Sequence, residues 1–429
     1  MPPSWQTYCI RLGRIAVAKF QFWFFEYNSC QSKTIGLESL MSYNFDNLSI
    51  EKLAKKASMK WQKYPKGTVP LWVADMDYPI ADEIKKAIVD YIETNNFGYA
   101  DYEGLPDLKE AAIERMWERY GWGLNHEHIF PISGIVQGLV LGVLAASSKN
   151  EEVIIQTPVY GPFMIAVEKY DRVPVYNQLV RDVDGWQIDF DALKAQISPA
   201  TRLLMLCNPH NPVGRVYSRY ELEKLAEIVL EHRLWVVSDE LHSDIIFSGY
   251  KHTPFASISP EVAQRTITLF GPTKTFNIAG LKIGFIATEN SALMQHIQHI
   301  ALGIVNKPNV IAQTATIAAY REGQEWLNYS LKYLEANRDF VAEYVFNNLK
   351  NVKHFPAEGS YLAWLDLSKY NLENPSDYLL EQAKVAMNDG AWFGPGGEGH
   401  VRLNFATSRS IVRDALERIR VALGNAPVT

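Results

Sequence analysis

Three short segments contain residues whose types and positions could do chemistry. Lys274 follows an apolar run in FGPTKTF, Asp239 ends the apolar run LWVVSD, and Asn211 lies in the proline-flanked loop CNPHNPVGR. A lysine after a strand lies where α/β enzymes present catalytic groups, a buried aspartate needs a partner, and flanking prolines present an amide rigidly. Each also has an ordinary alternative, namely a solvated lysine, a turn or capping aspartate, and a simple connecting loop.

The elements that would position these residues alternate between apolar runs and amphipathic stretches. The apolar runs predict strands at residues 153–158, 173–180, 202–208, 234–240, 266–272 and 281–288. Between them, a stretch such as 218–233 has helical spacing of its apolar residues and Ser218 as a cap. Near-continuous apolar strands are typical of a sheet covered by helices on both faces. The alternation therefore predicts an α/β fold with a mostly parallel sheet.

The C-terminal part has a different pattern. Helices are predicted at 325–349, 377–389 and 410–423, and strands at 360–367 and 400–406. This mixture predicts a smaller α+β domain, which the short segment 41–88 would join. We therefore expect a large domain over 89–325 and a small domain assembled from 41–88 and 326–429.

Composition narrows the possible functions. The 429 residues include 47% hydrophobic and 21% charged residues, enough to bury a core. With 42 basic and 48 acidic residues the net charge is −6, so nucleic acid is not expected as a partner. The three cysteines cannot form a disulfide framework or a four-cysteine zinc site (Cys9, Cys30, Cys207). This usage suits a reducing cytosol, and we expect a cytoplasmic protein with no membrane partner.

The first forty residues differ from the rest. Their apolar run, residues 15–25, is interrupted by Lys19, lacks a signal-peptide cleavage site and is far shorter than the ~20 residues that span a bilayer. Met41 then opens a sequence typical of a globular enzyme. We expect residues 1–40 to be a disordered extension outside the fold; a targeting or anchoring segment and an additional packed element are the alternatives.

Asn211, Asp239 and Lys274, in this order and at comparable spacing, resemble the aminotransferase class I and II family, the fold-type I pyridoxal-phosphate enzymes. The resemblance covers about residues 41–429. It implies a large domain with a mostly parallel seven-stranded sheet between helices, and a smaller α+β domain. It also implies pyridoxal 5'-phosphate as cofactor. Lys274 would then bind the cofactor aldehyde covalently, Asp239 would pair with the pyridinium nitrogen, and Asn211 would bond the ring hydroxyl.

The resemblance assigns further cofactor and substrate contacts. Tyr160 would stack on the pyridine ring as a third catalytic residue beside Lys274 and Asp239, and His242 would lie close by. Arg402 would clamp the substrate α-carboxylate, helped by Asn211 and Tyr99. The phosphate would bind at the glycine-led start of an apolar helix and to nearby side chains (Gly134, Ile135, Val136, Thr273, Lys282). Tyr99 would reach this phosphate from a second subunit, which implies a homodimer with shared active sites.

Two residues depart from the family pattern, and two other motifs are set aside. Gly271 replaces a serine that often contacts phosphate, and Val213 replaces a threonine. His126 and His128 have no third ligand nearby, so no metal is expected. The glycine-rich run 394–400 lacks the order and following helix of a phosphate loop and is interpreted as a turn that leads into the Arg402 strand.

Two segments narrow the reaction, because the cofactor alone does not specify it. Residues 71–80 (LWVADMDYPI) and 393–406 (FGPGGEGHVRLNFA) resemble the cystathionine β-lyase, or carbon–sulfur lyase, branch. The branch implies α,β-elimination in sulfur amino acid metabolism and methionine biosynthesis, releasing homocysteine, pyruvate and ammonia from cystathionine. An aminotransferase and a cofactor-binding regulatory protein are the alternatives. The sequence does not reveal the pocket for the substrate side chain, so it does not distinguish among cystathionine, cystine, cysteine and other S-conjugates as substrates.

Overall fold

The computed structural model describes residues 43–98, 104–183 and 185–428. The expectations for residues 1–40 and for Tyr99 therefore lie outside the described residues. The described residues from Phe45 onward form one compact unit.

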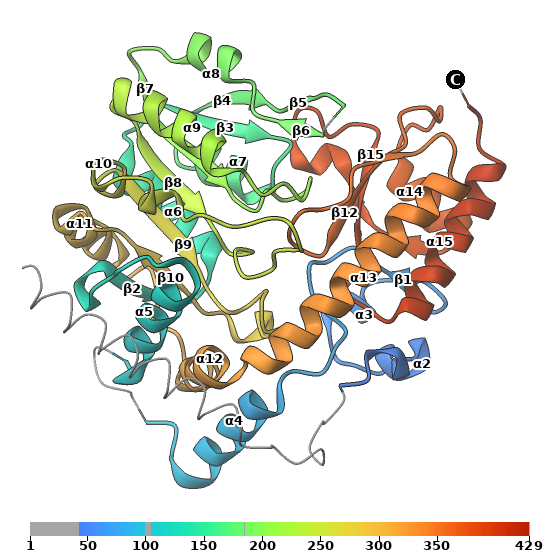
Figure 1. The fold of residues 1–429 in the computed structure, drawn as a ribbon, viewed down its shortest axis with the longest axis horizontal. Coiled ribbons are helices and arrows are strands. Elements are labelled where there is room, and N and C mark those ends of the chain that lie inside the picture. Colours follow the sequence, from blue (N-terminus) through green and yellow to red (C-terminus); the bar gives the residue numbers. More distant parts are fainter. Residues whose placement is uncertain (1–42, 99–103, 184, 429) are drawn as a thin grey trace, which may run out of the picture. The chain divides into compact units, whose positions relative to one another are not determined.

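A seven-stranded sheet forms the centre of this unit (Figure 1). Its strands, from one edge to the other, are β2 (Ile129–Ile132), β10 (Gly284–Ala287), β9 (Thr266–Phe270), β8 (Trp235–Asp239), β7 (Thr201–Cys207), β3 (Glu152–Thr157) and β4 (Val173–Gln178). The five strands from β9 to β4 are parallel, and β10 is antiparallel to both of its neighbours. The six predicted strands all form, and the mostly parallel seven-stranded sheet is confirmed.

Helices cover both faces of this sheet, which explains why its strands are apolar throughout. Alternate residues of β7 point to opposite faces, so Leu203 and Met205 enter one core while Leu204 and Leu206 enter the other. The first core is completed by α6 (Ile135–Ala146), α7 (Pro162–Glu168) and α11 (Ser291–Ala301). The second is completed by α8 (Phe190–Gln196), α9 (Arg219–Glu231) and α10 (Pro260–Ala263). Ser218 caps α9 through a capping box with Glu221, as its position in the sequence predicts.

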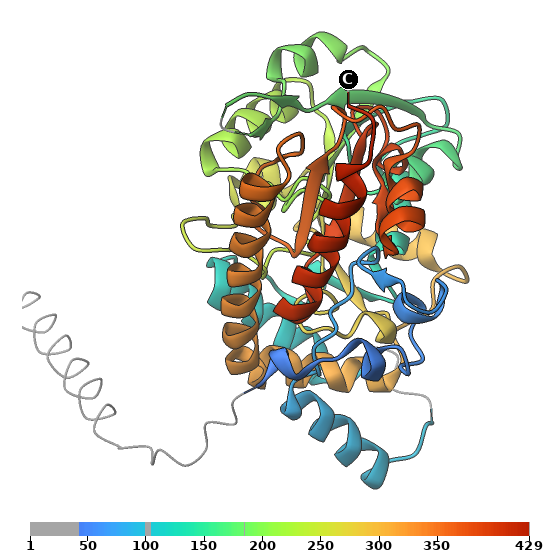
Figure 2. The same cartoon turned by 90° about the vertical axis from the view of Figure 1, so that its right-hand side faces the viewer.

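A second, antiparallel sheet is built mainly from the C-terminal part. Its order is β11 (Lys353–His354), β12 (Leu362–Asp366), β15 (His400–Asn404) and β14 (Asn388–Asp389). The helices of this part are α13 (Gln324–Asn348), α14 (Pro375–Ala383) and α15 (Arg409–Gly424). Figure 2 shows α13 (orange) and α15 (red) running along this region, with the blue segment of residues 45–80 beside them.

The prediction of one helix over 377–389 is wrong. Helix α14 ends at Ala383, and Lys384 takes a left-handed conformation. The chain then forms two short strands, because Val385 and Ala386 (β13) pair with β1 (Val69–Pro70) and Asn388 pairs with Arg402 of β15. Backbone partners that are distant in sequence thus outweigh the local helical pattern.

The remaining elements connect these layers. They are α2 (Ile50–Leu53), α3 (Met59–Gln62), α4 (Asp82–Thr94), α5 (Asp107–Tyr120), α12 (Val310–Glu322), β5 (Val180–Arg181) and β6 (Trp186–Gln187). Five 3₁₀ helices are also described: η2 (Phe45–Asn47), η3 (His126–His128), η4 (Phe255–Ser257), η5 (Ala279–Leu281) and η6 (Gly390–Phe393). The predicted domain boundaries fall inside α4 and α13, and the division into two domains stays a prediction. Within the described ranges, no helix is long and apolar enough to cross a membrane.

Candidate active site

The three segments that carry Asn211, Asp239 and Lys274 meet at one edge of the large sheet. Strands β7, β8 and β9 are parallel, so their carboxyl ends lie side by side. Asn211 follows β7, Asp239 is the last residue of β8, and Lys274 follows β9. The carboxyl edge of a parallel sheet is where α/β proteins bind ligands. The fold therefore brings these three residues together, as their order in the sequence predicts.

Asp239 is a buried acid without a cation of its own. Its side chain is 8% exposed, and its Oδ1 accepts a hydrogen bond from the Leu241 amide at 3.1 Å. Among the described residues, no lysine, arginine or histidine forms an ion pair with it. Burial raises the pKa of Asp239 to about 7, because the ionised form loses its hydration. A positively charged ligand group would restore the ionised state.

Lys274 is a half-buried amine with a lowered pKa. Its Nζ donates to the carbonyl oxygen of Ala74 at 2.5 Å. Burial, together with the nearby charge of Arg402, lowers the pKa of Lys274 to about 8, although the charges of Asp75 and Asp239 act in the opposite direction. About a tenth of the amine is therefore neutral at pH 7, far more than for an ordinary lysine, and the neutral form is the nucleophilic and basic one.

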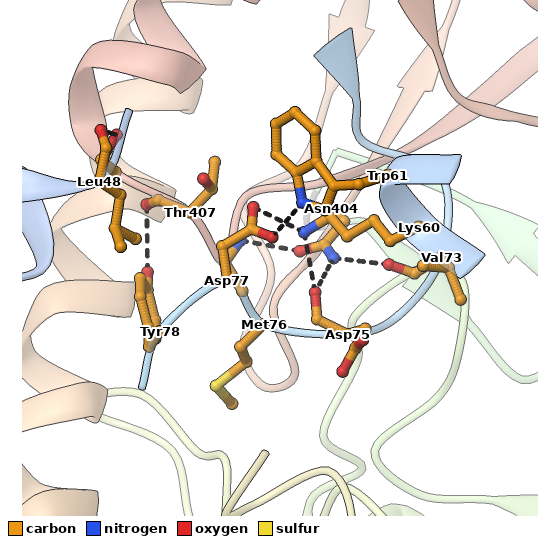
Figure 3. A network of polar contacts seen from close by, with 12 residues as sticks. Leu48, Lys60, Trp61, Val73, Asp75, Met76, Asp77, Tyr78, Asn404 and Thr407 are labelled. Atoms are coloured by element: carbon orange, nitrogen blue, oxygen red, sulfur yellow. Dashed lines mark hydrogen bonds and ion pairs between the residues drawn. The ribbon is translucent and has the colours of Figure 1, made fainter. Parts of the chain in front are cut away.

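The segment that carries Ala74 is fixed from one side by Asn404 and by a buried ion pair (Figure 3). The Asn404 amide donates to the carbonyl oxygens of Val73 at 2.6 Å and Asp75 at 2.7 Å. Asp77 accepts from Lys60 at 2.9 Å and from the Trp61 indole at 2.7 Å. Since these groups are buried, their hydrogen bonds hold Ala74 in a fixed position.

Asn277, three residues after Lys274, holds the same segment from the other side. Its Oδ1 accepts from the Met76 amide at 3.1 Å, and its amide donates to the Tyr78 carbonyl at 2.7 Å. The segment of residues 73–78 and the loop after β9 are therefore joined by hydrogen bonds around Lys274.

Arg402 is a buried cation whose hydrogen-bond partners are all neutral. Its side chain is 3% exposed on β15. Nη1 donates to Asn211 Oδ1 at 2.9 Å, while Nη2 donates to Asn388 Oδ1 at 2.7 Å and to the Trp72 carbonyl at 2.9 Å. Burial lowers the pKa of Arg402 to about 10. A buried cation without an anion is costly, so the site is suited to an anionic ligand.

His210 joins the loop of Asn211 to the turn of Tyr160. Its Nε2 lies 2.8 Å from the Pro158 carbonyl oxygen, and its Nδ1 lies 3.0 Å from the Tyr217 hydroxyl. A carbonyl only accepts, so Nε2 carries the proton and Nδ1 accepts from Tyr217. The Tyr160 amide also donates to the Asn211 carbonyl at 3.0 Å. The two loops are therefore hydrogen-bonded to each other.

Tyr160 and His242 lie at the same edge as predicted. Tyr160 is half-buried, its ring meets Trp392 at 5.4 Å between centroids, and burial raises the pKa of its hydroxyl. His242 is buried, and its Nδ1 lies 3.0 Å from the Ser360 hydroxyl. Burial lowers the pKa of His242 to about 3, so its ring is neutral at physiological pH. Both are aromatic rings available to pack on a flat ligand.

Helix α6 directs its N-terminus to this edge. A Cβ on Gly138 would lie 2.8 Å from Leu269 of β9, and one on Gly142 would lie 2.5 Å from Val237 of β8. The helix therefore packs directly on β8 and β9 and runs opposite to them. Gly134 precedes it with φ of 141°, and no side chain among the described residues caps its first amides, so these amides could accept an anion.

The other residues assigned to phosphate differ in their surroundings. Ile135 and Thr273 are buried, Val136 is 46% exposed, and Lys282 is exposed with a left-handed backbone. At Gly271 a Cβ would lie 3.0 Å from the Cα of Gly284, so the serine usual at this position would displace β10. Tyr99 lies outside the described residues, and its contact with phosphate stays a prediction.

The structure also adds residues that sequence reasoning missed. Asn388 binds Arg402 but falls in the segment wrongly predicted as helix. The carbonyls of Trp72 and Ala74 have no signature in the sequence, because any residue type supplies a carbonyl. Asn404 could have been suspected, since it lies two residues after Arg402 on the same strand.

His126 and His128 occupy other roles. His126 Nε2 lies 2.6 Å from Glu110, and His128 accepts from the Asn125 amide in its own turn. No cluster of three or more metal-binding side chains occurs in the part of the chain that the structure describes.

Comparison with known proteins agrees with this geometry. Residues 66–419 match the family described as aminotransferase class I and II. The chain is 39% identical over 394 residues to cystathionine β-lyase PatB of Bacillus subtilis, covering 89% of this chain and 100% of that protein. A PLP-bound C–S lyase from Staphylococcus hominis has a TM-score of 0.84 at 33% identity, covering 89% of this chain and 99% of that one. A PLP-bound putative aminotransferase from Clostridium difficile has a TM-score of 0.84 at 35% identity, covering 89% and 100%.

Proposed function

This chain belongs to the aminotransferase class I and II family, and on that premise we propose that it is a carbon–sulfur β-lyase. Its cofactor is pyridoxal 5'-phosphate. The proposed substrates are L-cystathionine or related cysteine S-conjugates, which would yield a thiol, pyruvate and ammonia. With cystathionine the thiol is homocysteine. The observation that carries the choice of reaction is the similarity to a cystathionine β-lyase over that protein's whole length.

The residues at the sheet edge fit this cofactor at both of its ends. The Asp239 carboxyl, buried without a cation, suits a protonated pyridine nitrogen. The uncapped start of α6, with the buried Thr273 hydroxyl, suits the phosphate. Between them Lys274 offers an amine of lowered pKa to the aldehyde. The donor set therefore matches the cofactor in charge and in order.

Each side chain at the sheet edge has a separate role in the proposed reaction. When bound, pyridoxal phosphate withdraws electrons from the substrate α-carbon and so labilises the bonds at that carbon. We assign Arg402, with Asn211, to the α-carboxylate, because its guanidinium is buried with neutral partners only. Asp239 holds the proton on the ring nitrogen, and Tyr160 packs against the ring. Lys274 moves the proton at the α-carbon.

The proposed elimination balances in protons and electrons. The α C–H bond breaks and its proton passes to Lys274, while the β C–S bond breaks and its electron pair leaves with sulfur. Lys274 can return the proton to the thiolate. The three-carbon enamine that remains consumes one water and gives pyruvate and ammonia. No external oxidant or reductant is required.

The second candidate is an aminotransferase, favoured by the similarity to the putative aminotransferase from Clostridium difficile. The same residues would serve it, because the two reactions share removal of the α-proton. They differ in whether a keto acid is needed to accept the amino group. A regulatory role without catalysis is a third possibility, which intact Lys274, Asp239 and Arg402 disfavour.

One assay separates these candidates. Purified protein is incubated with L-cystathionine, and pyruvate and free thiol are measured without and with a keto acid. The lyase is supported by equal amounts of pyruvate and thiol without the keto acid, whereas turnover that requires the keto acid supports the aminotransferase. The Lys274→Ala variant should lose the cofactor's yellow absorbance band and the turnover together.

We also propose a homodimer with shared active sites, which follows from the resemblance of Tyr99 to a residue that crosses between subunits. Light scattering measures the mass in solution. Mixing an inactive Lys274→Ala protein with an inactive Tyr99→Ala protein should restore about a quarter of the native activity if the sites are shared in this way. A monomeric mass, or mixtures that stay inactive although subunits exchange, would contradict the proposal.

A further inference from the structure

A series of ring contacts leads outward from Arg402 to Trp392. The Arg402 guanidinium carbon lies 5.0 Å from the centre of the Phe393 ring. Phe393 is fully buried and meets Trp392 edge-on at 5.0 Å, with 89° between the ring planes. Trp392 in turn meets the Tyr160 ring at 5.4 Å. Trp392 is 43% exposed, so it is the solvent-facing end of this series.

The Trp392 indole is held in place by the turn that carries Tyr160. A Cβ on Gly161 would lie only 2.8 Å from the indole, so the missing side chain leaves room for the ring. The Val159 amide also donates to the Phe393 carbonyl at 2.8 Å. An apolar surface that is already fixed loses little entropy when a ligand packs on it.

The other groups that contact Arg402 are polar, in contrast to the Trp392 ring. The Arg402 guanidinium donates to Asn211, Asn388 and the Trp72 carbonyl, so these polar groups orient the guanidinium and offer no apolar surface to a substituent. Trp72 contacts Arg402 through its backbone carbonyl, and its indole has other partners. Its N–H donates to the Lys60 carbonyl at 3.2 Å, and the Lys63 ammonium lies 4.2 Å from its ring centre.

We propose that Trp392 is a specificity-determining residue that packs against the sulfur substituent of the substrate and favours aromatic and other bulky apolar substituents. The inference rests on the proposed lyase function, because it takes Arg402 as the carboxylate site and Tyr160 as the ring that covers the cofactor. An indole face gives an aromatic substituent both buried apolar area and edge or face contacts. A methyl substituent is too short to gain much from it.

The test compares two substrates that differ only in this substituent. S-benzyl-L-cysteine and S-methyl-L-cysteine are given to the cofactor-loaded protein, and kcat/KM is measured from pyruvate. Trp392→Ala should lower kcat/KM for the benzyl substrate about tenfold and change that for the methyl substrate less than about twofold. Trp392→Phe should keep most of the preference. Trp117→Ala, which removes a 63% exposed tryptophan on α5, is the matched control and should leave the ratio unchanged.

A second measurement does not depend on turnover. L-2-aminopentanoate and L-2-amino-5-phenylpentanoate are the carbon analogues of the two substrates and contain no sulfur to leave. Their dissociation constants follow from titration of the cofactor absorbance, and Trp392→Ala should weaken only the phenyl compound. Equal losses for both compounds would overturn the role of Trp392. If no S-conjugate yields pyruvate, the lyase proposal fails, while the analogue pair still decides whether Trp392 contacts the ligand side chain.

Discussion

The Lys274 Nζ donates a hydrogen bond to the carbonyl oxygen of Ala74 at 2.5 Å, across 200 residues of sequence. The same carbonyl accepts from the Tyr361 hydroxyl at 3.2 Å. A reactive amine from the loop after β9 is thus held by backbone from the N-terminal segment and by a neighbour from the C-terminal part. Three distant regions of the chain therefore set the position and the basicity of one functional group.

The lowered pKa of Lys274 predicts how fast the cofactor-free protein captures pyridoxal phosphate at each pH. Only the neutral amine attacks the aldehyde. The rate should therefore rise with pH and level off with a midpoint near 8, where a lysine with the ordinary pKa of 10.5 would still be rising. Stopped-flow absorbance records the capture. A rate that still climbs steeply above pH 9 would show that Lys274 has an ordinary pKa.

Asp239 predicts a pH-dependent stability of the cofactor-free protein. Its folded pKa is about 7 against an ordinary 3.8, a difference of about three units. Because the pKa is raised in the folded state, the contribution of Asp239 to the free energy of unfolding is fully present below pH 4. It is lost as the pH rises through 7. At about 1.4 kcal/mol per unit, the loss is on the order of 4 kcal/mol.

The variant Asp239→Asn tests this sign. It should equal the native protein in free energy of unfolding at pH 4 and exceed it at pH 8, both without cofactor. Denaturant titration at the two pH values measures the difference. With pyridoxal phosphate bound the gain should vanish, because the ionised Asp239 then has its pyridinium partner. Equal stability at both pH values would argue against a buried, neutral Asp239.

Replacing Arg402 by lysine should weaken binding of the substrate carboxylate although the positive charge is kept. In Arg402→Lys the planar fork that binds Asn211 and Asn388, and that we propose to bind the substrate carboxylate, is replaced by a single ammonium. KM for the amino-acid substrate should rise at least about tenfold, since a charge-assisted hydrogen bond contributes roughly 1.5–3 kcal/mol. Steady-state kinetics measures it. Arg181→Lys, which alters a partly exposed ion pair with Asp366, is the control, and matching effects in both variants would refute a specific role of Arg402.

The hydrogen bonds from the Asn404 side chain should be needed to hold the segment around Ala74 in place. Asn404→Ala leaves the Val73 and Asp75 carbonyls without their donor and should cost about 2–4 kcal/mol of stability. The midpoint pH of cofactor capture by Lys274 should shift as well, because Ala74 is no longer fixed. Asn348→Ala removes an exposed asparagine with a local bond at 3.0 Å and should change neither quantity. If the pH profile of cofactor capture is unaltered in Asn404→Ala, the segment around Ala74 does not influence the pKa of Lys274.

Elements with a strong periodic pattern were predictable, and those set by distant partners were not. The six predicted strands of the large sheet and helix α9 follow from apolar runs, alternation and the Ser218 cap, all of which are local. Residues 385–389 have helical composition but form strands, because β1 and β15 provide backbone partners that the local pattern does not reveal. For the same reason Asn388 was missed as a partner of Arg402.

The sequence by itself determined which groups could do the chemistry and in what order they occur. Asn211, Asp239 and Lys274 each follow an apolar run, and parallel strands necessarily end at the same edge. Only the tertiary structure decided how those groups are tuned. Burial raises the pKa of Asp239 and lowers that of Lys274, and the neutral partners of Arg402 leave it in need of an anion. Desolvation and hydrogen bonding depend on what packs around a residue, and that packing comes from chain segments far away in sequence.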